Sequence, residues 1–283
     1  MKIAAGIVTF NPNIERLMAN LKAVTPQVQE VFIVDNGSNN SGDIKVLIEK
    51  FTNITLMLLR DNKGIATALN EIGNWANLHQ YEWFLTLDQD SVVEPGLVNA
   101  YRSYLSFALV GQIDCTIVDR GNDELICSIK PGLEYEVVED TITSGSLVRT
   151  EAFLAVGGFD DKMFIDRVDY DFNFRLISHG FETIRIGFVG LYHELGKFKA
   201  VNFLGKTYSI VSHSPFRYYY ILRNEIILIR RYKDLPQFNA KQHRKELLTY
   251  VRNILVLDNN KLKNFLAFFR GALAGVTFGD IDV

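Results

Sequence analysis

Apolar and polar positions follow two alternating periods along the first third of the chain. Short, nearly continuous apolar runs typical of buried strands occupy residues 2–10, 30–35, 53–59 and 82–88. Between these runs, apolar residues recur at the i, i+3, i+4 spacing of amphipathic helices, at about 14–24, 43–50 and 65–79. Alternating strands and helices predict an α/β fold with a mostly parallel sheet flanked by helices.

The pattern changes twice further along. Two short strand-like runs flank a turn near residue 121 and predict a hairpin, with Cys115 and Cys127 on either side of the turn. From about 197 onward, aromatic and cationic residues dominate, and the periodicity predicts helices at 215–232, 245–257 and 262–278. We therefore expect an α/β domain over 1–214 and a basic, aromatic helical region over 215–283.

Composition narrows the class of protein. Of the 283 residues, 48% are hydrophobic and 22% are charged, which excludes an intrinsically disordered chain. Two cysteines cannot form a disulfide framework, and their spacing is not that of a zinc site. The N-terminus is typical of a first strand rather than a signal peptide, and no apolar stretch reaches the roughly 18 residues of a membrane-spanning helix. We expect a cytoplasmic protein.

Charge is divided unevenly along the chain. Residues 1–196 contain 15 lysines and arginines against 27 acidic residues, whereas residues 197–270 contain 15 against 4. Cationic amphipathic helices either pack on their own domain or lie at a membrane surface. Both interpretations stay open for the first two C-terminal helices, while the bulky apolar residues of 262–278 favour peripheral contact with the inner face of the cell membrane.

Polar residues follow each of the first four strands, at the edge where parallel sheets bind ligands. Asp88 and Asp90 follow the fourth strand, and such paired carboxylates hold Mg²⁺ or Mn²⁺ that is shared with substrate phosphates. Thr9 and Asp35 follow the first two strands, where a carboxylate can accept a hydrogen bond from a nucleotide base. An ordinary strand-ending turn is the alternative for Asp35.

Asn62, Lys63 and Gly64 precede a helix, so the helix N-terminus and the lysine can face a diphosphate; a simple N-cap is the alternative. A second acidic cluster within 160–171 includes more carboxylates than helix capping needs, and one of them is a candidate general base. His193 follows a later strand, and by itself such a histidine is more often a surface or core residue than a ligand.

Seven motifs occur together in a set order: IVTFNP, IVDNGS, DNKGIATALN, FLTLDQDS, SGSLVR, GGFDDKMFIDRVDYDFNFRL and YHELG. In this order and spacing the chain resembles the inverting GT-A glycosyltransferases of family 2, and looks most like bacterial rhamnosyltransferases that use dTDP-L-rhamnose. The resemblance covers about residues 1–230. As a set the motifs are specific, although each alone is weak.

The resemblance implies a role for each matching position. It implies that Thr9, Asp35, Asn62, Lys63 and Gly64 bind the nucleotide. Ser144, Gly145 and Ser146 would shape the sugar pocket. Asp90 and His193 would bind the metal, and Asp88 would contact the metal or the ribose. Asp169 would be the catalytic base. Val168 stands where the family has a glutamate, so Asp166 and Asp171 also stay candidates for the base.

The implied reaction transfers a sugar, with inversion, to a hydroxyl of a growing, lipid-linked surface polysaccharide. A UDP-sugar donor and a non-catalytic sugar-nucleotide-binding protein are the alternatives. A nucleotidyltransferase is disfavoured because residues 9–12 lack that class's glycine-rich loop, and no recognised nucleic-acid-binding module surrounds the basic region. The tyrosine-rich helix at 216–232 could form a homodimer face.

Overall fold

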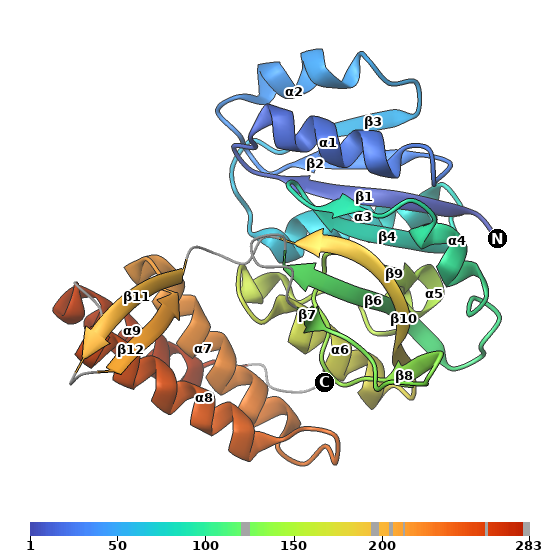
Figure 1. The fold of residues 1–283 in the computed structure, drawn as a ribbon. Coiled ribbons are helices and arrows are strands. Elements are labelled where there is room, and N and C mark those ends of the chain that lie inside the picture. Colours follow the sequence, from blue (N-terminus) through green and yellow to red (C-terminus); the bar gives the residue numbers. More distant parts are fainter. Residues whose placement is uncertain (120–124, 194–197, 204–205, 212, 258–259, 280–283) are drawn as a thin grey trace.

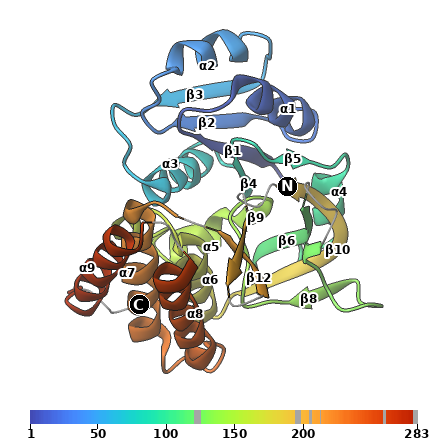
Figure 2. The ribbon, with the colours of Figure 1, turned by 60° about the vertical axis from the view of Figure 1, so that its left-hand side comes forward.

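A computed structural model describes residues 1–119, 125–193, 198–203, 206–211, 213–257 and 260–279 (Figure 1). Of the described residues from 193 to 211, and of 256 and 257, only the backbone is described. Among the described residues, a large mixed sheet forms the centre, and three helices gather at one end of it beside α6 (Figures 1 and 2).

The sheet has the strand order β3-β2-β1-β4-β9-β6-β10-β5. Its strands are β1 Ile3–Thr9, β2 Val31–Asp35, β3 Ile54–Leu58, β4 Trp83–Asp88, β5 Val92–Val93, β6 Val110–Asp119, β9 Ser146–Arg149 and β10 Glu182–His193. Strands β1 to β4 are parallel, β9 runs antiparallel between β4 and β6, and β10 is parallel to β6. Two short strands, β7 Leu125–Cys127 and β8 Tyr135–Val137, pair with β6 and β10.

Helices cover both faces of this sheet. They are α1 Ile14–Val24, α2 Ser41–Ile48, α3 Ile65–Leu78, α4 Leu97–Arg102, α5 Thr150–Ala155 and α6 Val168–Ser178, with a 3-10 turn at Asp161–Met163. One core cluster packs α1, α2 and α4 against the sheet, and a second packs α3, α5 and α6 against the other face. Small residues set the spacing: a Cβ on Gly6 of β1 would lie 2.2 Å from Ile72 of α3, so only glycine permits this approach.

The C-terminal part combines a hairpin with helices. It contains β11 Phe198–Phe203, β12 Lys206–Val211, α7 Pro215–Tyr232, α8 Ala240–Arg252, a π-helical turn at Asn253–Leu257, and α9 Lys261–Val276. Helix α9 crosses α7 closely at two glycines. A Cβ on Gly271 or Gly275 would lie within 2.7 Å of the carbonyl oxygen of Tyr219 or Arg223, respectively. Among the described residues, no helix is both long enough and apolar enough to cross a bilayer.

The predicted α/β architecture is confirmed. All four predicted N-terminal strands and all three helices between them are present, with bounds that differ by two residues or fewer. Helix α8 begins five residues earlier than predicted, and its predicted end is a π-helical turn. The hairpin β11–β12 was not predicted, because its alternating polar residues carry no continuous apolar run. The division at residue 214 stays a prediction.

Candidate active site

The ends of three neighbouring parallel strands bring together the first predicted site residues. Thr9 lies beside Asp35 in the register of β1 and β2, and Asp88 pairs with Val8 on the other side of β1. The Thr9 hydroxyl donates a hydrogen bond of 2.9 Å to the Asp35 carboxylate, which also accepts from the backbone N–H and hydroxyl of Ser38. Thr9 and Asp35 are buried, so their orientation is set by the fold.

Asn36 organises the second predicted loop. Its side-chain oxygen accepts from the backbone N–H of Lys63 at 2.8 Å, and its amide nitrogen donates to Asn62 and to the carbonyl of Gly64. Gly64 has a φ of 89°, and a Cβ there would lie 2.6 Å from the carbonyl oxygen of Phe164. Glycine is therefore required where this loop meets the second acidic cluster.

The two carboxylates of the fourth strand's end lie on a tight turn. The backbone of Asp88 is held at both ends, since its N–H donates to Ser144 Oγ at 3.1 Å and its carbonyl accepts from Asn20 at 2.7 Å. Asp90 is half-exposed and lies 3.7 Å from the Arg16 guanidinium. Oxygen donors on one short turn fit the preference of a hard divalent cation. His193 ends β10 beside Asp119, and its side chain lies outside the described residues.

Ser144, Gly145 and Ser146 lie beneath this turn. Ser144 donates to Ser91 at 2.7 Å in addition to accepting from Asp88. Gly145 has a φ of 88°, and its carbonyl accepts from the buried Tyr101 hydroxyl. Ser146 is fully buried and donates to the carbonyl of Ile142. Ser144 contributes to the cavity described below, whereas the other two shape the backbone behind it.

A cavity of about 420 Å³ joins the turn at Asp88 to the second acidic cluster. Its lining includes Asp88, Ser144, Asp166, Arg167, Asp169, Arg217 and Tyr250. Residues from β4, α6, α7 and α8 therefore meet at one cavity, although more than 150 positions separate the first from the last. A donor sugar next to the turn would lie beside the carboxylates of the acidic cluster.

The structure distinguishes the three candidate bases. Asp171 is fully buried and pairs with Arg175 and Arg231 at 2.7 Å each. Asp166 lines the cavity but is held by Arg217 at 2.5 Å. Asp169 lines the cavity at the first turn of α6, and burial raises its pKa to about 6, against the opposing effects of the Tyr170 backbone N–H and of Arg167.

Comparison with known proteins decides the family. The family model described as Glycosyl transferase family 2 matches residues 5–145. A dTDP-rhamnosyl transferase from Shigella flexneri, RfbF, is 30% identical over 295 residues, covering 98% of this chain and 97% of the relative. The chain belongs to glycosyl transferase family 2. This family 2 glycosyltransferase is also similar to an N-acetylglucosaminyl-diphospho-decaprenol L-rhamnosyltransferase from Mycobacterium tuberculosis, at 24% identity over 69% of the chain and 76% of the relative.

Solved structures agree on the fold of this glycosyltransferase. S. aureus TarS 1–349 in complex with UDP-GlcNAc superposes with a TM-score of 0.65 at 16% identity, covering 96% of this chain and 82% of TarS. GalNAc-T7 with UDP, GalNAc and Mn²⁺ superposes with a TM-score of 0.59 at 12% identity, covering 87% and 54%. The predicted GT-A fold and glycosyltransferase class are confirmed.

Sequence reasoning missed several residues of this glycosyltransferase's site. Arg217 and Tyr250 line the cavity from C-terminal helices that the patterns assigned to other surfaces. Asn36 lies inside a predicted motif, yet its bonds to the neighbouring loop could not be read from spacing. Val168, which stands where the resemblance implies a glutamate, is 4% exposed, belongs to the second core cluster and also lines the cavity. At this position an apolar side chain of the core therefore borders the cavity.

Proposed function

We propose that this family 2 glycosyltransferase moves L-rhamnose from dTDP-L-rhamnose to a hydroxyl of an acceptor glycan, with inversion and with a divalent metal. The observation that carries the donor is the near full-length similarity to a dTDP-rhamnosyl transferase. The rhamnosyltransferase name of a second, more distant relative supports the same sugar. A UDP-sugar donor, as bound in the TarS complex, is the competing assignment.

The chain's own residues would divide the work as follows. Thr9 and Asp35 bind the nucleotide at the sheet edge, and the Asn62 loop with Lys63 lies against the diphosphate. Asp169 accepts the proton of the acceptor hydroxyl while that oxygen attacks C1 of the sugar. The bond from C1 to the diphosphate breaks on the opposite side, so a β-linked donor yields an α-linkage.

Asp88, Asp90 and His193 are the residues that would hold Mn²⁺ or Mg²⁺. When bound, such an ion supplies positive charge that stabilises the leaving diphosphate. The two carboxylates on one turn at the end of β4 support this assignment, and the backbone of Asp88 is fixed by Ser144 and Asn20. Mn²⁺ in the GalNAc-T7 structure supports it at the level of the fold.

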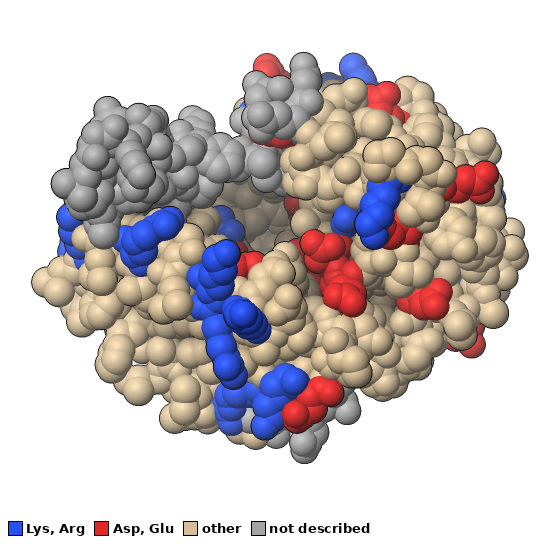
Figure 3. All heavy atoms as spheres, turned by 60° about the horizontal axis from the view of Figure 1, so that its bottom comes forward, with Lys and Arg blue, Asp and Glu red and all other residues tan. Residues whose placement is uncertain are grey.

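The acceptor in this proposal is an anionic, lipid-linked glycan. A second cavity of about 1090 Å³ extends along α8, shares Tyr250 with the first, and is lined by the cations Lys241, Arg244 and Lys245. Figure 3 shows Lys and Arg side chains on the side of the C-terminal helices, next to a hollow in this face. Charge complementarity supports a phosphate-bearing acceptor that approaches the base from α8.

The outer face of α9 supports contact with a membrane surface. Its exposed apolar side chains recur at helical spacing, at Leu262, Leu266, Phe269, Leu273 and Val276. Three exposed cations, Lys261, Lys263 and Arg270, lie on the same helix, which has no acidic residue. A helix of this kind fits the headgroup region of an anionic bilayer.

Thermal unfolding with nucleotides tests the donor. We expect dTDP with Mn²⁺ to raise the melting temperature more than UDP or GDP does at the same concentration, because the nucleotide with the lowest Kd stabilises the folded state most. A ligand at 100 times its Kd stabilises the folded state by about 2.7 kcal/mol. Asp90→Asn should weaken the metal-dependent part of the shift. A shift with UDP alone would overturn the donor, and a shift with dTDP that needs no metal would overturn the metal site.

A further inference from the structure

The loop before the candidate base has an unusual backbone. Phe164, Asp166 and Arg167 have φ values of 60°, 64° and 65°, a region that residues with a Cβ seldom occupy. At Phe164, with a ψ of −63°, the N–H of Ile165 bonds back to the carbonyl of Met163 at 2.7 Å. Such a γ-turn with positive φ is rare and strained, so the surroundings must hold it.

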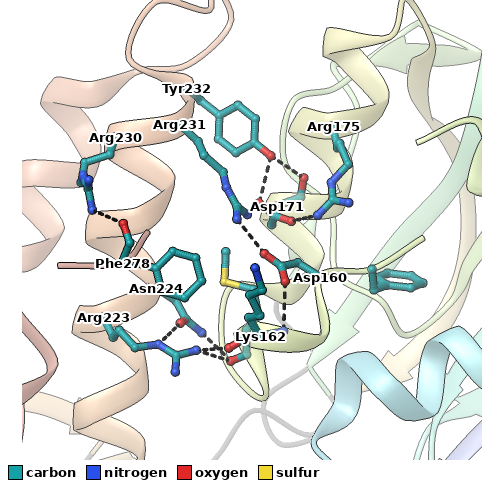
Figure 4. Close-up of polar contacts among 12 residues, drawn as sticks. Asp160, Lys162, Asp171, Arg175, Arg223, Asn224, Arg230, Arg231, Tyr232 and Phe278 are labelled. Atoms are coloured by element: carbon teal, nitrogen blue, oxygen red, sulfur yellow. Dashed lines mark hydrogen bonds and ion pairs between the residues drawn. The ribbon is translucent and has the colours of Figure 1, made fainter. Parts of the chain in front are cut away.

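The side chains that hold this loop come from α7. Asn224 is fully buried, and its amide nitrogen lies within 2.9 Å of three loop carbonyls, those of Met163, Ile165 and Asp166. Arg223 donates to the carbonyls of Lys162 and Met163 (Figure 4). Loop carbonyls that no regular structure could satisfy are therefore satisfied by one helix.

Residues of α7 also contact the side chains of the loop, through ion pairs and an aromatic stack. Arg217 pairs with Asp166 at 2.5 Å, and the buried Glu225 pairs with Arg167 at 2.6 Å. Tyr220 stacks on the ring of Phe164 with centroids 5.1 Å apart. These α7 residues and Asn224 recur at the spacing of one helix face, so α7 contacts both the backbone and the side chains of the loop.

Helix α7 is itself fixed at its C-terminal end. Arg231 pairs with Asp160 and Asp171, which lie on either side of the loop, at 2.7 Å each (Figure 4). Arg230 donates to the carbonyls of Gly275 and Phe278, joining α7 to the end of α9. The loop is therefore held against a helix that cannot shift independently of α6 and α9.

We propose that α7 positions the catalytic base: Asn224, with Arg217 and Arg223, keeps the strained 162–167 loop in the conformation that aims Asp169 into the cavity. This inference rests on the assignment of Asp169 as the base. Asn224 is fully buried and does not itself line the cavity; it acts through the backbone of the loop, so it is a positioning residue. The C-terminal helices are then part of the transferase machinery and not only an attachment surface.

Hydrogen exchange and kinetics on Asn224→Asp test the proposal. The substitution keeps the shape of the side chain but replaces the donating amide nitrogen by an oxygen. That oxygen would face the three loop carbonyl oxygens and could not donate to them. Ile227→Ala is the matched control, because Ile227 lies on the same helix, is fully buried in the second core cluster and has an apolar side chain that cannot donate to a loop carbonyl. Arg217→Met, at a side chain that is 45% exposed, with Arg217→Lys as its conservative partner, covers the case in which Asn224→Asp does not fold.

We expect faster amide exchange at residues 162–169 in Asn224→Asp and Arg217→Met, but not in Ile227→Ala or Arg217→Lys. Release of dTDP from dTDP-L-rhamnose, with water as acceptor, should show a kcat at least tenfold lower in Asn224→Asp with KM within about twofold. Equal exchange in Asn224→Asp and Ile227→Ala would overturn the proposal. Absence of dTDP release by the unaltered protein would instead overturn the donor, and the exchange measurement would still decide the positioning role.

Discussion

At the scale of single residues, the environment of Asp169 supports its proposed role as the base. Burial disfavours its charged form and raises its pKa to about 6, while Arg167 and the backbone N–H of Tyr170 act in the opposite direction. A base of this strength is ionised at neutral pH and still has a useful affinity for a proton. Asp171, two residues away, has its charge satisfied by Arg175 and Arg231 and is not available for this role.

Two measurements on Asp169 follow. The kcat/KM of the unaltered enzyme should fall as the pH drops through about 6, because the protonated carboxyl cannot accept a proton.

Asp169→Asn should lower kcat about 10²–10⁴-fold and keep the melting-temperature shift with dTDP, because the amide is isosteric and does not accept the proton. Asp234→Asn, at an exposed carboxylate, serves as control. Turnover retained in Asp169→Asn would move the base to Asp166.

At the scale of elements, a buried charge cluster joins α6 to α7. Asp171 lies between Arg175 of its own helix and Arg231 of α7, and it accepts a hydrogen bond from Tyr232 at 2.9 Å. Arg231 extends the cluster to Asp160 at the start of the 3-10 turn. Removing one partner of such a buried ion pair lowers the stability of the fold, because the remaining partner keeps its charge and loses the opposite charge that compensated it.

Asp171→Asn should therefore destabilise the fold by about 3–5 kcal/mol, the usual cost of removing one partner from a buried pair. Urea unfolding followed by circular dichroism measures this as a lower transition midpoint. The same control, Asp234→Asn, removes a carboxylate that is 90% exposed and pairs with Lys233 at 4.0 Å, so its midpoint should not change. Equal midpoints for the two variants would mean that the α6–α7 cluster contributes nothing to stability.

Elements with local periodicity could be predicted from the sequence, and so could much of the candidate site. Each of β1 to β4 is an apolar run, and the polar residues that follow them meet because parallel strands end at one edge. Asp169 could be chosen only through family resemblance. The structure adds the reason, since Asp166 is paired with Arg217 and Asp171 is inside the core.

Contacts made by α7 could not be predicted. Asn224 and Glu225 are polar residues inside a helix that otherwise shows an apolar face, and nothing local indicates that both are buried. Their partners lie about 60 positions earlier in the sequence, in a loop whose positive φ values are imposed by tertiary contacts. Aromatic and cationic residues here suggested a surface, whereas several of them bind the loop or line the cavity.

At the scale of the whole molecule, the uneven charge along the chain becomes an arrangement in space. The acidic part forms the sheet and its helices, and the basic part forms the helices beside it (Figures 1 and 3). Helix α9 packs Gly271, Gly275 and Phe268 against the rest of the C-terminal helices, while an apolar stripe from Leu262 to Val276 is exposed. Helix α8 contributes Tyr250 to the cavity that Asp169 lines, so an acceptor headgroup along α8 would lie next to that cavity.

Vesicle flotation tests the proposed membrane contact of α9. Leu266→Glu with Phe269→Glu places two carboxylates in the exposed apolar stripe of α9, where the unaltered side chains are 52% and 53% exposed. We expect the unaltered protein to float with phosphatidylglycerol vesicles and this variant to stay behind, because burial of apolar side chains and roughly 1 kcal/mol per cation both favour the anionic surface.

The matched control carries the same two changes outside the C-terminal helices, at Val46 of α2 and Leu78 of α3, which are 61% and 77% exposed. Its melting temperature and its flotation should equal those of the unaltered protein. If both variants float equally well, α9 does not contact lipid. If the α9 variant instead loses a dimer that sedimentation detects in the unaltered protein without vesicles, the stripe is covered by a second copy of the chain, and the membrane assignment fails.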